Sequence, residues 1–245
     1  MMKSALPLVA PFFLFMAFLM VVDGRFPDQH YALYPFKTIL VALAIAWFWR
    51  SLPSLKPGAT LLSAGVGVIA VVLWVGLDPW AMQIDIFLEK LFNRFVSAVG
   101  LGSWRTPVDG VPVGRNPFQL YPSALAWTLF GFRVAGIALC VPVMEELFWR
   151  GFLMRWLIRE DFTTVPIGTY QPFSFYATTT LFAMEHGSEW PQAVVVGLIY
   201  GVWFVRTRKL GDVMVAHGVT NLLLALYCLG SSDWHFLSTV APAHR

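Results

Sequence analysis

Two neighbouring glutamates and an arginine interrupt an apolar run, VPVMEELFWRGFL, at residues 141–153. Glu146 and Arg150 are four residues apart, which places them on one helix face in the favourable acid-before-base order. Such a pair makes both ions tolerable in a low dielectric, where a lone charge would neutralise or resist burial. Glu145 is offset from Glu146 by about 100°, so its carboxylate can point elsewhere, towards a cavity. A carboxylate placed there can act as a base on a positioned water.

Two further apolar runs contain polar side chains with the same spacing. His217 and Asn221 are four residues apart and share a helix face. A buried Asn supplies an NH₂ donor and a neutral His supplies one N–H, so the two together can hold a developing oxyanion. His186 follows Phe182 at the same spacing, which packs an aromatic ring one turn below the imidazole.

Each of these features alone has a structural explanation. A Glu–Arg pair can tie helices together, a single membrane histidine is more often a packing residue, and an Asn often holds neighbouring helices together by hydrogen bonds. These explanations do not account for the similar depth at which the four polar side chains are expected in the membrane. By the rise per residue, Glu145 and His186 each lie about 20 Å from the cytoplasmic end of their expected spans, and His217 and Asn221 lie about 9 and 15 Å in. We therefore predict one polar site in one layer of the membrane.

Composition indicates the class of protein that must position these side chains. The chain is 58% hydrophobic and 13% charged, with a mean hydropathy of +0.65. Several apolar runs approach the length of about 20 residues that crosses a bilayer. The expected fold is therefore all-α, a polytopic integral membrane helical bundle of seven or eight transmembrane helices in contact with the lipid bilayer. The small net charge of +3 argues against a nucleic-acid partner.

The pattern of apolar runs gives an expected organisation. One membrane domain over 1–245 is divided into an N-terminal part, 1–118, and a catalytic core, 119–230. The segment 81–99 mixes charges with Ile, Leu and Phe and suggests an amphipathic interfacial helix, residues 100–118 an irregular connection, and 119–132 a partial or additional span. The spans are expected at 5–22, 31–49, 60–77, 134–158, 173–187, 191–206 and 211–230.

Basic residues orient these spans. If the spans alternate, one side of the membrane receives most of the positive charge: Lys3, Arg50, Lys56, Arg155, Arg159, Arg206, Arg208 and Lys209. The opposite side receives Asp23, Asp28, Asp78 and Asp85. By the positive-inside rule, the N-terminus is expected in the cytoplasm.

The three polar motifs together resemble a known family. The stretches 145–150, 182–186 and 217–221 are similar to the EExxxR, FxxxH and HxxxN motifs of the CAAX-protease and bacteriocin-processing (CPBP) intramembrane endopeptidases. The resemblance covers roughly residues 134 to 225, with Pro142 and Gly151 flanking the first motif. Glu185 departs from the motifs by adding an acid directly before His186.

The resemblance implies a glutamate-dependent peptidase without a metal or other cofactor. Glu145 would activate water with help from His186, while His217 and Asn221 would polarise the scissile carbonyl and form the oxyanion hole. Glu146, Arg150 and Phe182 would support the site. The expected substrate is a membrane-tethered or membrane-entering protein segment.

A second, shorter resemblance involves YPFKT, Tyr34–Thr38, followed by a Trp- and Phe-rich span. This stretch looks like bacterial family members associated with exosortase systems. It would place the protein in a bacterial inner membrane, with a functional link to exosortase sorting and a substrate that carries a C-terminal sorting helix.

Three other functions remain open at this stage. One carboxylate and two histidines also match a common zinc ligand set, although no HExxH helix is present. A non-catalytic membrane scaffold would have no need to keep every acid, base and donor. A transporter or proton relay also buries Glu and His, but repeated halves are not visible in the sequence.

Overall fold

Helices account for all the regular structure that the computed structural model describes, which covers residues 2–23, 25–26, 29–105 and 114–237. The long helices are α1 (Met2–Phe18, continued by a π-helical turn over Leu19–Asp23), α2 (His30–Phe48), α3 (Thr60–Ala98), α5 (Ser123–Ala135), α8 (Pro172–Glu185), α9 (Trp190–Thr207) and α10 (Leu210–Ser231). The short ones are α4 (Pro117–Leu120), α6 (Val141–Glu146), α7 (Met154–Trp156) and 3₁₀ turns at Trp49–Ser51, Gly102–Trp104, Phe162–Thr164, Gly187–Glu189 and His235–Leu237.

The outside of the bundle is apolar, as expected for a protein surrounded by lipid. Among the described residues, four helical stretches are long and apolar enough to cross a bilayer: His30–Ser51, Thr60–Ala98, Ser123–Trp156 and Leu210–Ser231. Ala5–Val21 is a shorter apolar helix. Large side chains such as Leu43, Trp47 and Leu61 face outwards. The prediction of an all-helical integral membrane bundle is confirmed.

Two predicted boundaries are wrong. The expected span 60–77 and the expected interfacial helix 81–99 form one helix, α3, which continues through Pro79. Similarly, 119–132 is not a separate span, because helix runs from Ser123 to Trp156 through two π-helical segments, Gly136–Cys140 and Leu147–Leu153.

The physical reason is the same in both cases. In apolar surroundings an unpaired backbone group costs several kcal/mol, so a helix that continues is favoured over one that stops. Charged side chains inside these two helical stretches have partners within the protein. Asp78 is buried and accepts a hydrogen bond from Gln192, and Arg133 is buried and donates to the main-chain carbonyl of Leu237.

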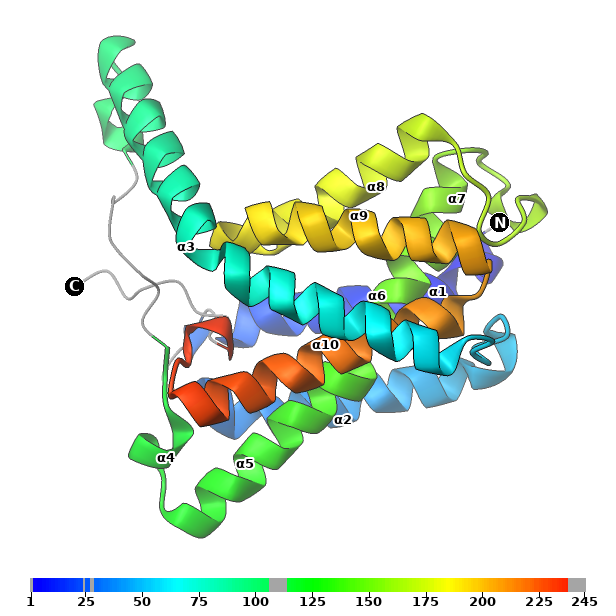
Figure 1. Ribbon diagram of the computed structural model, residues 1–245, viewed down its shortest axis with the longest axis horizontal. Helices are drawn as coiled ribbons and strands as arrows, with labels where there is room; N and C mark the ends of the chain where they lie inside the picture. Colours follow the sequence, from blue (N-terminus) through cyan, green and yellow to red (C-terminus); the bar gives the residue numbers. More distant parts are fainter. Residues whose placement is uncertain (1, 24, 27–28, 106–113, 238–245) are drawn as a thin grey trace.

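Helix α10 lies inside the bundle and positions the site. It packs against α3 on one side and against α6 and the π-helical segment Gly136–Cys140 on the other. Helix α9 packs on both α3 and α8, while α2 contacts α1 and α5. The C-terminal half of α3 projects beyond the other helices (Figure 1). The predicted cytoplasmic N-terminus stays a prediction; Asp28 and residues 106–113 lie outside the described residues.

A glycine sets the distance between α3 and α10. A Cβ added at Gly67 would lie 2.4 Å from the main-chain oxygen of Ala216 and 2.8 Å from Val219, closer than atoms can approach. By contrast, a Cβ added at Gly65, two residues away in α3, meets nothing within 4 Å. Close backbone approach at small residues is how membrane helices associate.

We therefore expect Gly67→Ala to destabilise the protein by about 1–3 kcal/mol, since the two helices must separate. Gly65→Ala serves as the matched control and should cause no loss of stability, because Ala favours helix over Gly. Thermal unfolding of both variants in detergent measures the difference. Equal unfolding temperatures for the two variants would contradict the close packing of α3 on α10.

Candidate active site

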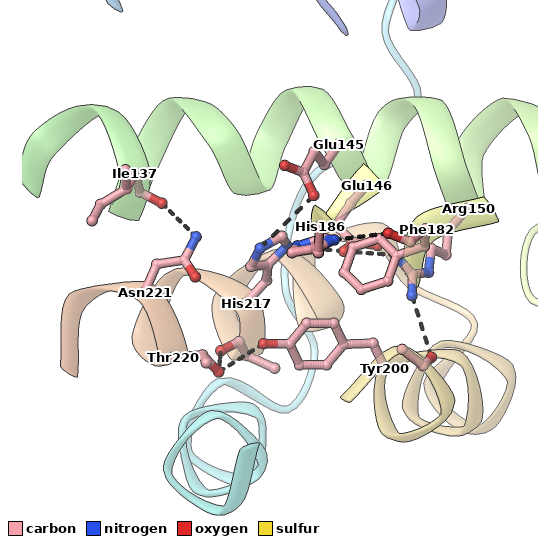
Figure 2. A network of polar contacts seen from close by, with 12 residues as sticks. Ile137, Glu145, Glu146, Arg150, Phe182, His186, Tyr200, His217, Thr220 and Asn221 are labelled. Carbon is pink, nitrogen blue, oxygen red and sulfur yellow. Dashed lines mark hydrogen bonds and ion pairs between the residues drawn. The ribbon is translucent and has the colours of Figure 1, made fainter. Parts of the chain in front are cut away.

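The four predicted site residues line one cavity. A cavity of about 550 Å³ receives side chains from Glu145, His186, His217 and Asn221. They come from α6, the C-terminal end of α8, and α10. The sequence-based prediction that these side chains meet is therefore confirmed, whereas their chemical roles remain predictions. Figure 2 shows the polar contacts around this cluster.

Glu146 is the centre of the hydrogen-bonded network. Its carboxylate is fully buried, and one oxygen, Oε1, lies 3.1 Å from Arg150 Nη1 and 3.1 Å from His217 Nδ1. Arg150 also donates to the main-chain carbonyl of Gly197 in α9 and lies 4.8 Å from the centre of the Phe182 ring. The predicted Glu146–Arg150 pair is confirmed, and it ties three helices together.

His217 is oriented by this network. Because a carboxylate only accepts hydrogen bonds, His217 carries a proton on Nδ1 and donates it to Glu146. Its other nitrogen, Nε2, then faces Glu145, with 4.0 Å between Nε2 and the Glu145 Oε2 atom. Glu145 points into the cavity while Glu146 does not, as the helical offset predicted.

His186 is oriented by its own helix. Its Nδ1 lies 2.7 Å from the main-chain carbonyl of Phe182, so Nδ1 is the donor. In the neutral ring Nε2 is then free to accept a proton. Two rings hold the imidazole in place: Phe182 at 4.6 Å between ring centres and Trp74 at 5.5 Å. The predicted packing of Phe182 on His186 is confirmed.

Asn221 is held by an irregularity of the helix that carries Glu145. The segment Gly136–Cys140 is π-helical, so the Val141 N–H bonds to the Gly136 carbonyl, five residues back. The next residue, Pro142, has no N–H to offer the Ile137 carbonyl. That carbonyl instead accepts a hydrogen bond from Asn221 Nδ2 at 2.8 Å. The second N–H of the Asn221 amide is left for another acceptor.

Several residues around the site were not predicted from the sequence. Gly218 lets α10 approach this π-helical segment, because an added Cβ would lie 2.6 Å from the Ala138 oxygen. Tyr200 packs against His217 and donates to Thr220, 2.7 Å away, which also bonds to main-chain carbonyls. Glu185 was noted as an extra acid, and it lines the same cavity. For Gly218 and Thr220 the sequence signal was their position inside the HGVTN stretch.

A metal site would need at least three ligating side chains close together. Within the described ranges, no three His, Cys, Asp or Glu side chains lie close enough together to hold one metal ion. The two imidazoles of the site each use Nδ1 in a hydrogen bond, His217 with Glu146 and His186 with the Phe182 carbonyl.

The rim of the cavity has a second polar cluster. His235, which follows α10, lies 3.3 Å from Asp78 in α3 and 2.6 Å from Asp233. Burial lowers the pKa of His235, but hydrogen bonds and attraction from the two aspartates outweigh it and raise the pKa to about 9. Burial raises the pKa of nearby Glu189 to about 8. Both His235 and Glu189 lie outside the membrane-spanning segments.

The fold and the site together define an integral membrane protein with an acid–imidazole–amide cluster buried in its helical bundle. Residues 124–223 match the family described as type II CAAX prenyl endopeptidase, Rce1-like. All three motifs lie inside this match, so the resemblance to the CPBP family is confirmed over these residues, about two fifths of the chain. No curated protein and no solved structure matches the chain.

The buried ion pair leads to a prediction about stability. Arg150→Met should cost about 3–5 kcal/mol, because it leaves the Glu146 carboxylate buried with less compensation. The double variant Glu146→Gln, Arg150→Met should recover part of this loss, since the side-chain oxygen of Gln can still accept the His217 hydrogen bond. Unfolding in detergent measures both. A double variant less stable than Arg150→Met alone would contradict this account of the pair.

The rim cluster leads to a prediction about pH. The folded protein holds a proton on His235 up to about pH 9, whereas the unfolded chain releases it near 6.5. This contribution to stability is therefore complete below pH 6.5 and lost as the pH rises through 9. The pKa of Glu189 is likewise raised in the folded protein, from 4.5 to about 8, so its contribution to stability is also lost as the pH rises through 8. Unfolding temperatures should fall between pH 6.5 and 9.

His235→Gln should flatten this decline, because Gln cannot titrate. The comparison is between wild type and variant in one detergent at four pH values from 6 to 9. A decline of the same steepness in His235→Gln would show that His235 is not the titrating group.

Proposed function

We propose that this protein is an intramembrane endopeptidase, in which Glu145 and His186 activate water and His217 and Asn221 stabilise the oxyanion. The observation that carries the proposal is the meeting of these four side chains in one buried cavity. The match to a family of CAAX prenyl endopeptidases supports hydrolysis of a peptide bond.

The first step of the proposed reaction uses the two bases. Glu145 removes a proton from a water molecule while the water oxygen attacks the carbonyl carbon of the scissile peptide bond. His186 assists through Nε2, which is free to accept because Nδ1 donates to the Phe182 carbonyl. Burial of the Glu145 and His217 side chains within the bundle strengthens these interactions, because electrostatic attraction is stronger in a low dielectric.

In the next part of the proposed reaction, hydrogen-bond donors stabilise the negative charge that develops on the carbonyl oxygen. Asn221 can donate its second amide N–H while the first remains on Ile137. His217 can donate from Nε2 only as the doubly protonated cation, because its Nδ1 proton is held by Glu146. When the C–N bond breaks, the proton taken by Glu145 passes to the leaving amine.

The position of the site restricts the substrate. A polypeptide must enter the bundle beside lipid to reach Glu145, so we propose a membrane-tethered or membrane-entering segment as substrate. Location in a bacterial inner membrane with the N-terminus in the cytoplasm stays a prediction. So does the exosortase link, because it depends on Tyr34–Thr38, which lie outside the matched residues 124–223.

Purified protein with membrane-anchored substrates tests this proposal. Glu145→Gln and His186→Gln should each lower cleavage by at least about 10²-fold, the scale of a lost general base. Glu160→Gln, an exposed glutamate in the loop after α7, serves as the control and should cleave like wild type. Cleavage is followed by mass spectrometry of the products, with and without a strong chelator.

Each outcome separates the candidates. Cleavage that survives the chelator and disappears in both variants supports the metal-free mechanism. Loss of cleavage on chelation, with recovery on adding zinc, would replace it with metal chemistry. Wild-type rates in either variant would show that the proposed bases are wrong.

A further inference from the structure

The C-terminal half of α3, residues 80–98, which we call the arm, carries an exposed apolar face. Six large side chains on this face are exposed: Trp80, Phe87, Leu88, Leu91, Phe92 and Phe95. At about 100° per residue, all six fall within an arc of about 140° around the helix. The charged residues of the arm fall outside that arc: Asp85, Glu89, Lys90 and Arg94. The arm is therefore an amphipathic helix.

Helix α3 is too long for a single crossing of the bilayer. Its 39 residues correspond to about 58 Å of helix, whereas the hydrocarbon core of a bilayer is about 30 Å thick. Pro79 lies at the midpoint of α3, and proline inside a helix causes a kink. Figure 1 shows α3 changing direction about halfway along its length. The arm therefore extends beyond the half of α3 that crosses the core.

Neither water nor the hydrocarbon core suits the arm. Large apolar side chains gathered on one face are unfavourable in water, and charged side chains are costly in hydrocarbon. A helix with one apolar and one charged face fits the boundary between the two, where the apolar face reaches the acyl chains. Lys90 and Arg94 lie one turn apart at one edge of the apolar face, so their charged ends can reach lipid phosphates.

Tryptophan residues at both ends of the arm indicate the same boundary. Trp80 begins the arm, and Trp104, in the 3₁₀ turn that follows it, is 65% exposed. Trp is enriched at membrane–water interfaces, because its ring is apolar and its N–H is polar. Arg105 Nε donates to Ser97 Oγ at 2.8 Å, which ties this turn to the arm.

We propose that the arm lies on the surface of the bilayer, with its apolar face inserted between the headgroups and the acyl chains. The partner is lipid, because the apolar face continues the lipid-facing surface of the crossing half of α3. Exposed apolar residues follow one stripe through both halves, spaced by 7, 11 and 7 residues and so close to whole turns: Leu62, Ile69, Trp80 and Phe87. This contact with the membrane is independent of the proposed peptidase function.

The root of the arm lies beside the cavity. Helix α3 packs against the 3₁₀ turn Gly187–Glu189, which lines the cavity, and Ala81 is fully buried. Asp78, three residues before Ala81, contacts both Gln192 and His235. An arm bound to the bilayer surface therefore holds the rim of the cavity at the level of that surface.

The test uses full-length protein in phosphatidylcholine liposomes, labelled on one introduced cysteine with an environment-sensitive NBD fluorophore. Cys140→Ala is the background, because the other native thiol, Cys228, is fully buried. Leu91→Cys and Lys90→Cys form the matched pair, since both residues are exposed and they lie about 100° apart around the helix. Lipids with a nitroxide on the acyl chain should quench the label on Leu91→Cys at least about threefold more than the label on Lys90→Cys.

Two further variants support this comparison. Val72→Cys, exposed in the crossing half of α3, is the positive control, and its label should be quenched by the same lipids. Leu91→Glu should lower the quenching of a label on Leu88→Cys by at least about twofold, because a charge at that depth is costly. Lys90→Glu places the same charge outside the apolar face and should leave that quenching unchanged.

Weak quenching on both Leu91→Cys and Lys90→Cys would place the arm in water and overturn the proposal. Equally strong quenching on both would place the whole helix in hydrocarbon, with the same consequence. A blue-shifted emission on Leu91→Cys without quenching by the lipid nitroxide would mean that protein covers the apolar face, either a second copy or another segment of the chain. That result would also overturn the proposal.

Discussion

The Glu146 carboxylate, shared by Arg150 and His217 inside the bundle, is the interaction on which the site depends. One oxygen receives both donors at 3.1 Å and has no access to solvent. A charge in this position is tolerable only if its partners stay in place, which makes the arrangement of α6, α9 and α10 obligatory. The same contact determines which nitrogen of His217 carries a proton, and so which nitrogen faces Glu145.

Backbone hydrogen bonding is the second constraint, and here the membrane makes it strict. A π-helical segment and Pro142 leave the Ile137 carbonyl without a helical partner. Within an apolar helical bundle, a donor from a neighbouring helix stabilises such a carbonyl, and Asn221 provides it. Gly218 makes the required approach of α10 feasible. The irregular helix is thus the means by which an amide is held beside Glu145.

The cavity has two chemically different ends. Glu145, His186, His217 and Asn221 form the end suited to water activation, and Arg133 is the cation at the other. Glu145 and Arg133 both belong to the helical stretch from Ser123 to Trp156. One continuous helical stretch therefore carries a residue of each end of the cavity.

The sequence by itself determined the class of protein, the three motifs and the Glu146–Arg150 pair, and it predicted that the four polar side chains meet. These follow from local properties: apolar run length, and spacing of four residues on a helix. Only the tertiary structure decided that 60–98 and 123–156 are continuous, because charged residues inside them, Asp78 and Arg133, find partners at Gln192 and Leu237, more than 100 residues away. It also decided that Asn221 bonds to Ile137 and that Glu146, not Glu145, holds His217. Such contacts join distant segments, and which segments meet depends on how whole helices pack, which no local pattern encodes.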